Sequence, residues 1–117
     1  MNSIKSLTKL IVVSLFIVSC SSSDDDSSPP TQLPTGITYT NTINSIMSQN
    51  CNVSGCHTTT AMAAGFALST YDEVKFAFQN RGALGQIESG NMPKNRDDLS
   101  EATINNIKGW MAENYPE

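Results

Sequence analysis

Cys51 and Cys56 are separated by four residues, and His57 follows the second cysteine directly. Two thiols and an imidazole this close in sequence are suited to three kinds of chemistry: a disulfide, a zinc site, or covalent attachment of haem. In the third case each cysteine sulfur adds to a haem vinyl group, and the adjacent histidine reaches the iron from one face. That attachment usually has two residues between the cysteines, so this chain carries a wide variant of the pattern.

The three interpretations make different demands on the chain. A disulfide explains both cysteines but leaves the adjoining histidine as coincidence. Structural zinc needs four protein ligands, so a carboxylate or a second chain would have to complete a site built on Cys51, Cys56 and His57. Covalent haem needs only two thioethers and one histidine on that face. We therefore favour haem, with the disulfide as the alternative.

A haem iron with six ligands also needs one from the opposite face. His57 is the only histidine in the chain, so methionine is the natural candidate. Met47 and Met111 lie on apolar helical stripes and are predicted to be core residues, and Met62 follows His57 too closely to wrap around the porphyrin edge. Met92 lies in a polar loop with glycine and proline, where no helical stripe explains it. The sequence therefore predicts Met92 as the far-side ligand.

The first part of the chain indicates export. Two lysines precede an apolar run at 10–18, which is too short to span a bilayer as a helix and is typical of a secretory signal. Residues 17–20 resemble a bacterial lipobox, in which Cys20 becomes the lipidated first residue of the mature chain. An ordinary signal peptide with an incidental cysteine is the alternative. The acidic run at 24–26 resembles signals that send some lipoproteins to the outer face of the outer membrane, so we expect anchoring in the cell envelope, at the outer membrane or the cell surface.

The rest of the chain divides into a linker and one domain. After the signal peptide at 1–19, residues 20–36 are rich in serine, aspartate and proline and cannot form a core. Residues 37–117 show helical periodicity and little strand signal, with helices expected at about 40–50, from Ser69 or Thr70 onward, at 83–88 and from Ser100 onward. The prediction is a small all-α domain. The net charge of −4 gives no reason to expect a nucleic acid partner.

This combination resembles a small class I c-type cytochrome domain with one haem. Such domains have a first helix that leads into the haem-binding cysteines, then a methionine–proline loop, then a C-terminal helix with a tryptophan. The matching residues are Cys51, Cys56, His57, Met92, Pro93 and Trp110. The residues around the cysteines are similar to cytochrome-like domains of bacterial envelope lipoproteins with the same wide spacing. The resemblance covers about 38–116.

The resemblance implies a fold, a cofactor and a function. It implies haem c bound through Cys51 and Cys56, with His57 and Met92 on the iron and the first and last helices packed across one another. It places four further residues around the haem: Phe66, Leu68, Tyr71 and Trp110. Such a protein is an electron carrier rather than an enzyme, and it exchanges single electrons with redox partner proteins of the envelope. The alternatives are a non-redox lipoprotein with a Cys51–Cys56 disulfide and a haem-based gas or redox sensor.

Overall fold

A computed structural model describes residues 32–117 of the chain. The predicted signal peptide, the predicted lipidation site at Cys20 and the acidic run at 24–26 lie outside the described residues. Every regular element within 32–117 is helical, which confirms the predicted all-α class for this range. No helix in the same range is long and apolar enough to cross a membrane.

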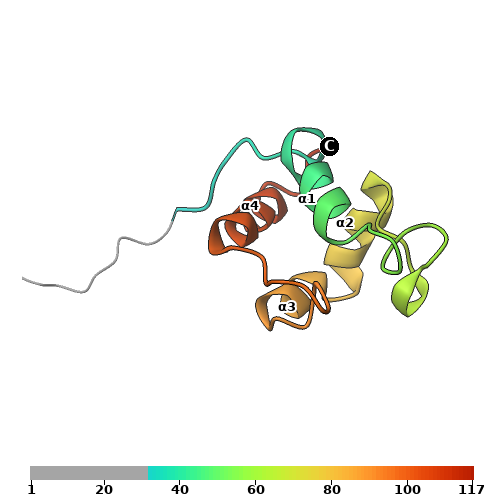
Figure 1. Cartoon of the computed structure of the whole chain (residues 1–117). Helices are drawn as coiled ribbons and strands as arrows, with labels where there is room; N and C mark the ends of the chain where they lie inside the picture. The colour runs from blue at the N-terminus through green and yellow to red at the C-terminus, as the bar shows by residue number, and fades with distance from the viewer. Residues whose placement is uncertain (1–31) are drawn as a thin grey trace, which may run out of the picture.

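Six helical elements follow one another along the described chain. They are η1 (Tyr39–Ile43), α1 (Asn44–Asn50), η2 (Ala63–Gly65), α2 (Tyr71–Asn80), α3 (Ala83–Glu88) and α4 (Glu101–Ala112). Figure 1 shows α1, α2 and α4 gathered around a common interior, with α3 at one end. The long 51–70 loop lies on the side remote from the point where the described chain begins (Figure 1).

Side-chain caps explain where the helices begin. Thr70 accepts a hydrogen bond from the backbone N–H of Glu73, and the Glu73 carboxylate accepts one from the backbone N–H of Thr70. The reciprocal pair satisfies two donors that a helix start would otherwise leave unpaired. Of the two predicted starts, Thr70 is therefore the right one. Ser100 caps α4 through the backbone N–H of Thr103, as predicted.

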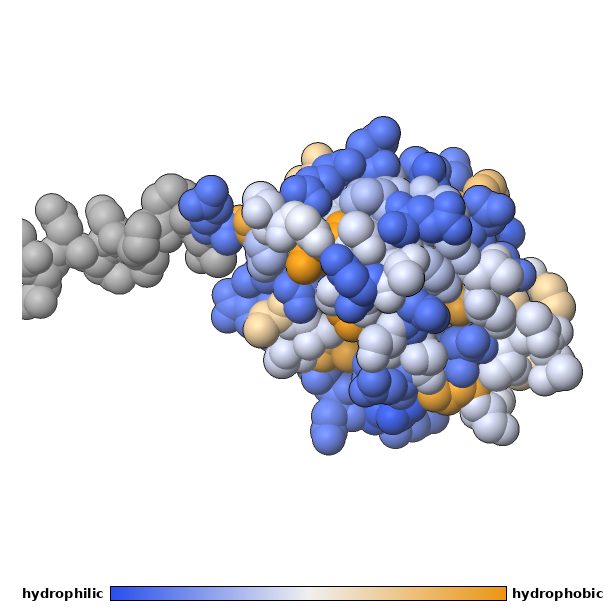
Figure 2. All heavy atoms as spheres, turned by 90° about the horizontal axis from the view of Figure 1, so that it is seen from above, coloured by the Kyte–Doolittle hydropathy of each residue, from blue (hydrophilic) through white to orange (hydrophobic). Residues whose placement is uncertain are grey.

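The core lies between the first and last helical segments. The largest fully buried side chains of the core are Ile43, Met47, Val74, Ile107 and Trp110. All but Trp110, which lies beside the stripe of the last helix, fall on the apolar stripes that the sequence shows. Helix α4 contacts η1, the π-helical turn that begins the first helical segment. The predicted packing of the first and last helices is therefore confirmed. Figure 2 shows an outer face that is largely hydrophilic, with small and separated apolar areas.

The C-terminal tail closes over the core. The carbonyl of Pro116 accepts hydrogen bonds from the indole N–H of Trp110 at 2.7 Å and from the backbone N–H of Tyr39 at 2.8 Å. The hydroxyl of Tyr71 donates to the carbonyl of Tyr115 at 2.7 Å. Three elements thus share one set of polar contacts at this end of the domain.

The segment that precedes η1 is held against α4. The backbone N–H of Gly36 lies 3.0 and 3.1 Å from the two carboxylate oxygens of Glu113. The same segment approaches α4 even more closely at Gly109. A Cβ at position 109 would collide with the carbonyl oxygen of Pro34. Glycine at position 109 therefore lets α4 pack directly against the incoming backbone.

Candidate functional site

One cavity of about 470 Å³ brings the sequence-predicted ligands together. Cys51, Cys56 and His57 reach it from the loop after α1, and Met92 reaches it from the loop after α3. The rest of the lining is mostly apolar: Met47, Ala63, Ala64, Phe66, Leu68, Phe78, Ala83, Ile87 and Pro93. Two thiols, an imidazole and a thioether, separated by up to 41 positions in sequence, therefore border one apolar space.

One of the two ring nitrogens of His57 makes a hydrogen bond. The residue is only 7% exposed and is the one buried polar residue in 32–117. Its Nδ1 lies 3.1 Å from the backbone carbonyl oxygen of Phe66. A carbonyl oxygen can only accept, so Nδ1 carries the proton and Nε2 keeps the lone pair in the neutral ring. Nε2 makes no hydrogen bond within the described range, which is the state of a histidine prepared to ligate a metal.

The backbone around His57 is fixed on both sides. Its N–H donates to the carbonyl of Cys51 at 3.1 Å, and its carbonyl accepts from the N–H of Leu68 at 2.8 Å. The N–H of Cys56 donates to the carbonyl of Val53 at 3.0 Å, which turns the chain between the two cysteines. Gly55 has a φ of +79°, a conformation that glycine adopts at little cost. The two extra residues between the cysteines are thus taken up by a compact turn.

Both cysteines are free thiols and half-buried. Burial, together with the neighbouring Cys56, raises the pKa of the Cys51 thiol to about 11, while Arg96 acts in the opposite direction. Cys51 is therefore protonated at neutral pH in this pocket. Within 32–117, no three histidine, cysteine or acidic side chains are grouped so that they could hold a metal ion directly.

Met92 is fixed to α3 through its backbone. Its N–H donates to the carbonyl of Gln86 at 3.0 Å, the side chain is half-buried, and Pro93 next to it is buried. Met62 is 46% exposed and does not line the cavity. Met47 is in the core, as predicted, but it also lines the cavity. Sequence reasoning missed this second contact, although its position four residues before Cys51 places it on the same side of the helix.

The predicted pocket residues separate into two pairs. Phe66 and Leu68 line the cavity. Tyr71 and Trp110 do not, which corrects the expectation that they surround the cofactor. Their polar atoms bind the C-terminal tail instead. A helical stripe shows which side chains face inward, but not whether they meet the cavity or the tail.

The charges on the cavity lining have one sign. Arg81 and Lys94 line it, and no aspartate or glutamate does, although acidic residues outnumber basic ones in the chain as a whole. Neither residue was predicted from the sequence. Their positions could have indicated them, because Lys94 follows the Met92–Pro93 pair and Arg81 follows the last residue of α2.

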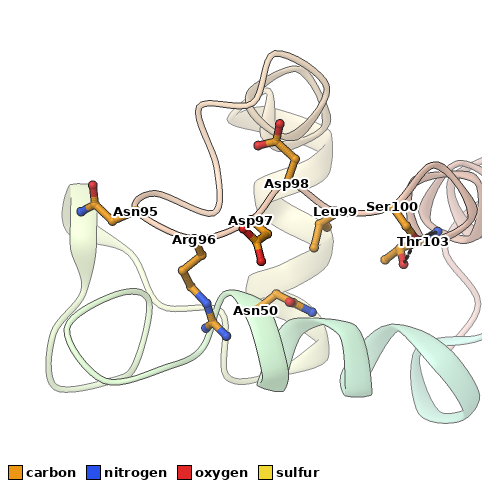
Figure 3. A pocket seen from close by; sticks show the side chains of 8 residues that line it. All are labelled: Asn50, Asn95, Arg96, Asp97, Asp98, Leu99, Ser100 and Thr103. Atoms are coloured by element: carbon orange, nitrogen blue, oxygen red, sulfur yellow. Dashed lines mark hydrogen bonds between the residues drawn. The ribbon is translucent and has the colours of Figure 1, made fainter.

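A second, polar hollow lies beside this cavity and shares Asn50 and Asn95 with it. In Figure 3 the side chain of Arg96 extends toward the end of α1, where Asn50 lies, while the carboxylate of Asp98 points the other way. A Cβ on Gly90 would lie 3.3 Å from the Asp98 carboxylate oxygens. The charged residues that line this hollow are of both signs: Arg96, Asp97 and Asp98.

No family model matches this chain, and no curated protein or solved structure matches it. The chemistry of the site therefore rests on its own residues. Two thiols, an imidazole with a free Nε2 and a thioether border an apolar cavity that has cations on its lining. Thioether bonds and two axial ligands are what such a set supplies to a covalently bound haem.

Proposed function

We propose that residues 37–117 form a class I c-type cytochrome domain, in which Cys51 and Cys56 bind one haem c covalently and which carries single electrons. The observation that carries this proposal is the hydrogen bond from His57 Nδ1 to the Phe66 carbonyl. It leaves Nε2 of a nearly buried imidazole as a ligand, next to the two thiols that would hold the porphyrin.

The lining of the cavity also suits this cofactor. A haem is a flat, largely apolar ring with two carboxylates, and a cavity of about 470 Å³ lies in the range of small-molecule sites. Apolar side chains supply contact with the ring. Lys94, one of the two cations of the lining, would lie where a haem carboxylate needs a partner, and Arg81 is the other. The absence of acidic residues from the described lining supports the same occupant.

The ligands favour electron transfer over catalysis. His57 and Met92 would both ligate the iron and leave no site on it for a substrate, and a bound haem would supply one-electron redox chemistry. The lipobox at Cys20 supports a chain anchored in the envelope, which exchanges electrons with redox partner proteins there. Incorporation of labelled palmitate that is lost in Cys20→Ala tests the anchor.

The test of the haem is its covalent retention. The full chain is produced in a host with cytochrome maturation machinery, run on a denaturing gel and stained for haem, and a second sample is extracted with acid–acetone. We expect haem to stay with the polypeptide in both procedures and to be lost in Cys51→Ala/Cys56→Ala. The matched control is Met62→Ala, whose side chain is exposed and away from the cavity.

Two other outcomes identify the alternatives. Colourless protein with Cys51 and Cys56 joined by a disulfide would overturn the proposal in favour of a non-redox lipoprotein. Haem-loaded protein that binds carbon monoxide tightly in its reduced form would keep the cofactor but show that Met92 is displaced, as in a gas sensor.

A further inference from the structure

We propose that Arg81 is a positioning residue for the haem ligand His57 and that its charge raises the reduction potential of the bound iron. This inference rests on the proposed function, because it assigns a role to a residue behind that ligand. Three side chains carry it: Arg81, Phe66 and His57, here called the Arg81–Phe66–His57 stack. They come from the end of α2 and from the 51–70 loop.

Phe66 holds His57 in two ways. Its carbonyl oxygen accepts the Nδ1 proton at 3.1 Å, and its ring centroid lies 4.5 Å from that of the imidazole, with 32° between the planes. The backbone contact fixes which nitrogen is free, and the ring contact restricts rotation of the imidazole. The orientation of His57 therefore depends on where Phe66 lies.

Arg81 in turn holds Phe66. Its guanidinium carbon lies 4.9 Å from the centre of the Phe66 ring, within the range of a cation–π contact. The same group lies 5.7 Å from the ring of Phe76, which is 51% exposed. The backbone N–H of Arg81 bonds to the carbonyl of Ala77 and so fixes the residue at the end of α2. Helix α2 is thereby coupled to the loop that bears His57.

Within residues 32–117, no carboxylate of the protein neutralises the charge of Arg81. The one ion pair in the described range joins Lys108 to Glu88, and Arg81 makes none there. An oxidised haem iron carries one more positive charge than the reduced iron, so a nearby cation destabilises the oxidised form more. The charge of Arg81 therefore favours the reduced state of the iron. Its planar guanidinium also stacks on Phe66 in a way that a lysine ammonium cannot reproduce.

The chain offers a matched control on the same helix. Lys75 also lies over an aromatic ring, 5.2 Å from the centre of Tyr71, and does not line the cavity. Lys75→Gln therefore removes one charge and one cation–π contact from α2, together with the hydrogen bond from Lys75 Nζ to the Tyr71 hydroxyl, without touching the stack. A difference between Arg81→Gln and Lys75→Gln isolates the effect of position.

The experiment compares midpoint potentials and ferric spectra of haem-loaded full-length variants. For Arg81→Gln we expect the equilibrium constant for reduction to fall about threefold, which is about 28 mV for one electron. Lys75→Gln should shift the midpoint potential by less than half as much. Arg81→Lys should restore most of the potential but not the wild-type electron paramagnetic resonance signature of the ferric iron, because the planar stack is lost. Phe66→Leu should disturb that signature more strongly.

Several results would overturn the inference. An unchanged potential in Arg81→Gln, or an equal shift in Lys75→Gln, would show that the position of Arg81 has no particular effect on the reduction potential. A ferric signature identical to wild type in Arg81→Lys would remove the positioning role, and this variant serves if Arg81→Gln does not fold. Wild-type protein without covalent haem would instead defeat the proposed function itself, which distinguishes the two failures.

Discussion

At the scale of single residues, the question is which sulfur would reach the iron. Met92 and Met47 both line the cavity. Met47 also belongs to the buried core and lies one helical turn before Cys51, which commits its side chain to packing. Met92 lies in a loop whose backbone is fixed to α3 while its side chain is only half-buried. Met92 is therefore the better candidate for the face opposite His57.

We predict that Met92→Ala in the haem-loaded protein abolishes the far-red sulfur–iron absorption band and lowers the reduction potential, because methionine ligation favours reduced iron. Optical spectra and redox titration check this. Met47→Leu should keep the band and lose roughly 1 kcal/mol of stability or less, as a core exchange of similar volume does. A band that persists in Met92→Ala and disappears in Met47→Leu would reverse the assignment.

Only the part of the candidate site formed by residues close together in sequence was predicted with its neighbours. Cys51, Cys56 and His57 are adjacent in sequence, so their common environment follows from any compact turn. That the Phe66 carbonyl selects the tautomer of His57 depends on how the 57–66 segment closes. Arg81 was missed because an arginine after a helix is an ordinary surface residue until the fold places Phe66 under it.

At the scale of elements, the close approach of α4 to the chain before η1 has a measurable consequence. We predict that Gly109→Ala destabilises the haem-loaded protein by about 1–3 kcal/mol, because a Cβ would collide with the Pro34 carbonyl and force the segment away. Thermal unfolding measures the change. Gly85→Ala in α3 is the control, since nothing lies within 4 Å of its Cβ position. It should gain up to about 1 kcal/mol from helix propensity.

Equal stabilities of Gly109→Ala and the wild type would mean that the segment before η1 is not held against α4.

The elements themselves were largely readable from capping residues and apolar stripes. Thr70 and Ser100 mark the starts of α2 and α4, and α3 has the predicted bounds. The π-helical turn that begins the first helical segment was not predicted, because it has the same apolar stripe as an α-helix. The roles of Tyr71 and Trp110 were misjudged because they depend on a C-terminal tail that carries no periodic signal.

At the scale of the whole molecule, the size of the cavity relative to the domain matters. A domain of this length buries a modest share of its surface, and here a partly open cavity of about 470 Å³ lies beside its core. We predict that Cys51→Ala/Cys56→Ala, made without haem, loses most of its helical circular dichroism, since the ligand that stabilises the native state is gone. Native-like helicity in the haem-free variant would show that the helices hold without the cofactor.

The attachment of residues 34–36 to α4 also determines on which side of the domain the described chain begins. The bonds from Gly36 to Glu113 lie on the α4 side, while the 51–70 loop is on the remote side (Figure 1). Residue 32, where the described chain begins, therefore lies on the α4 side of the domain. The loop with both thiols and the imidazole lies on the opposite side, so access to it does not pass the segment before η1.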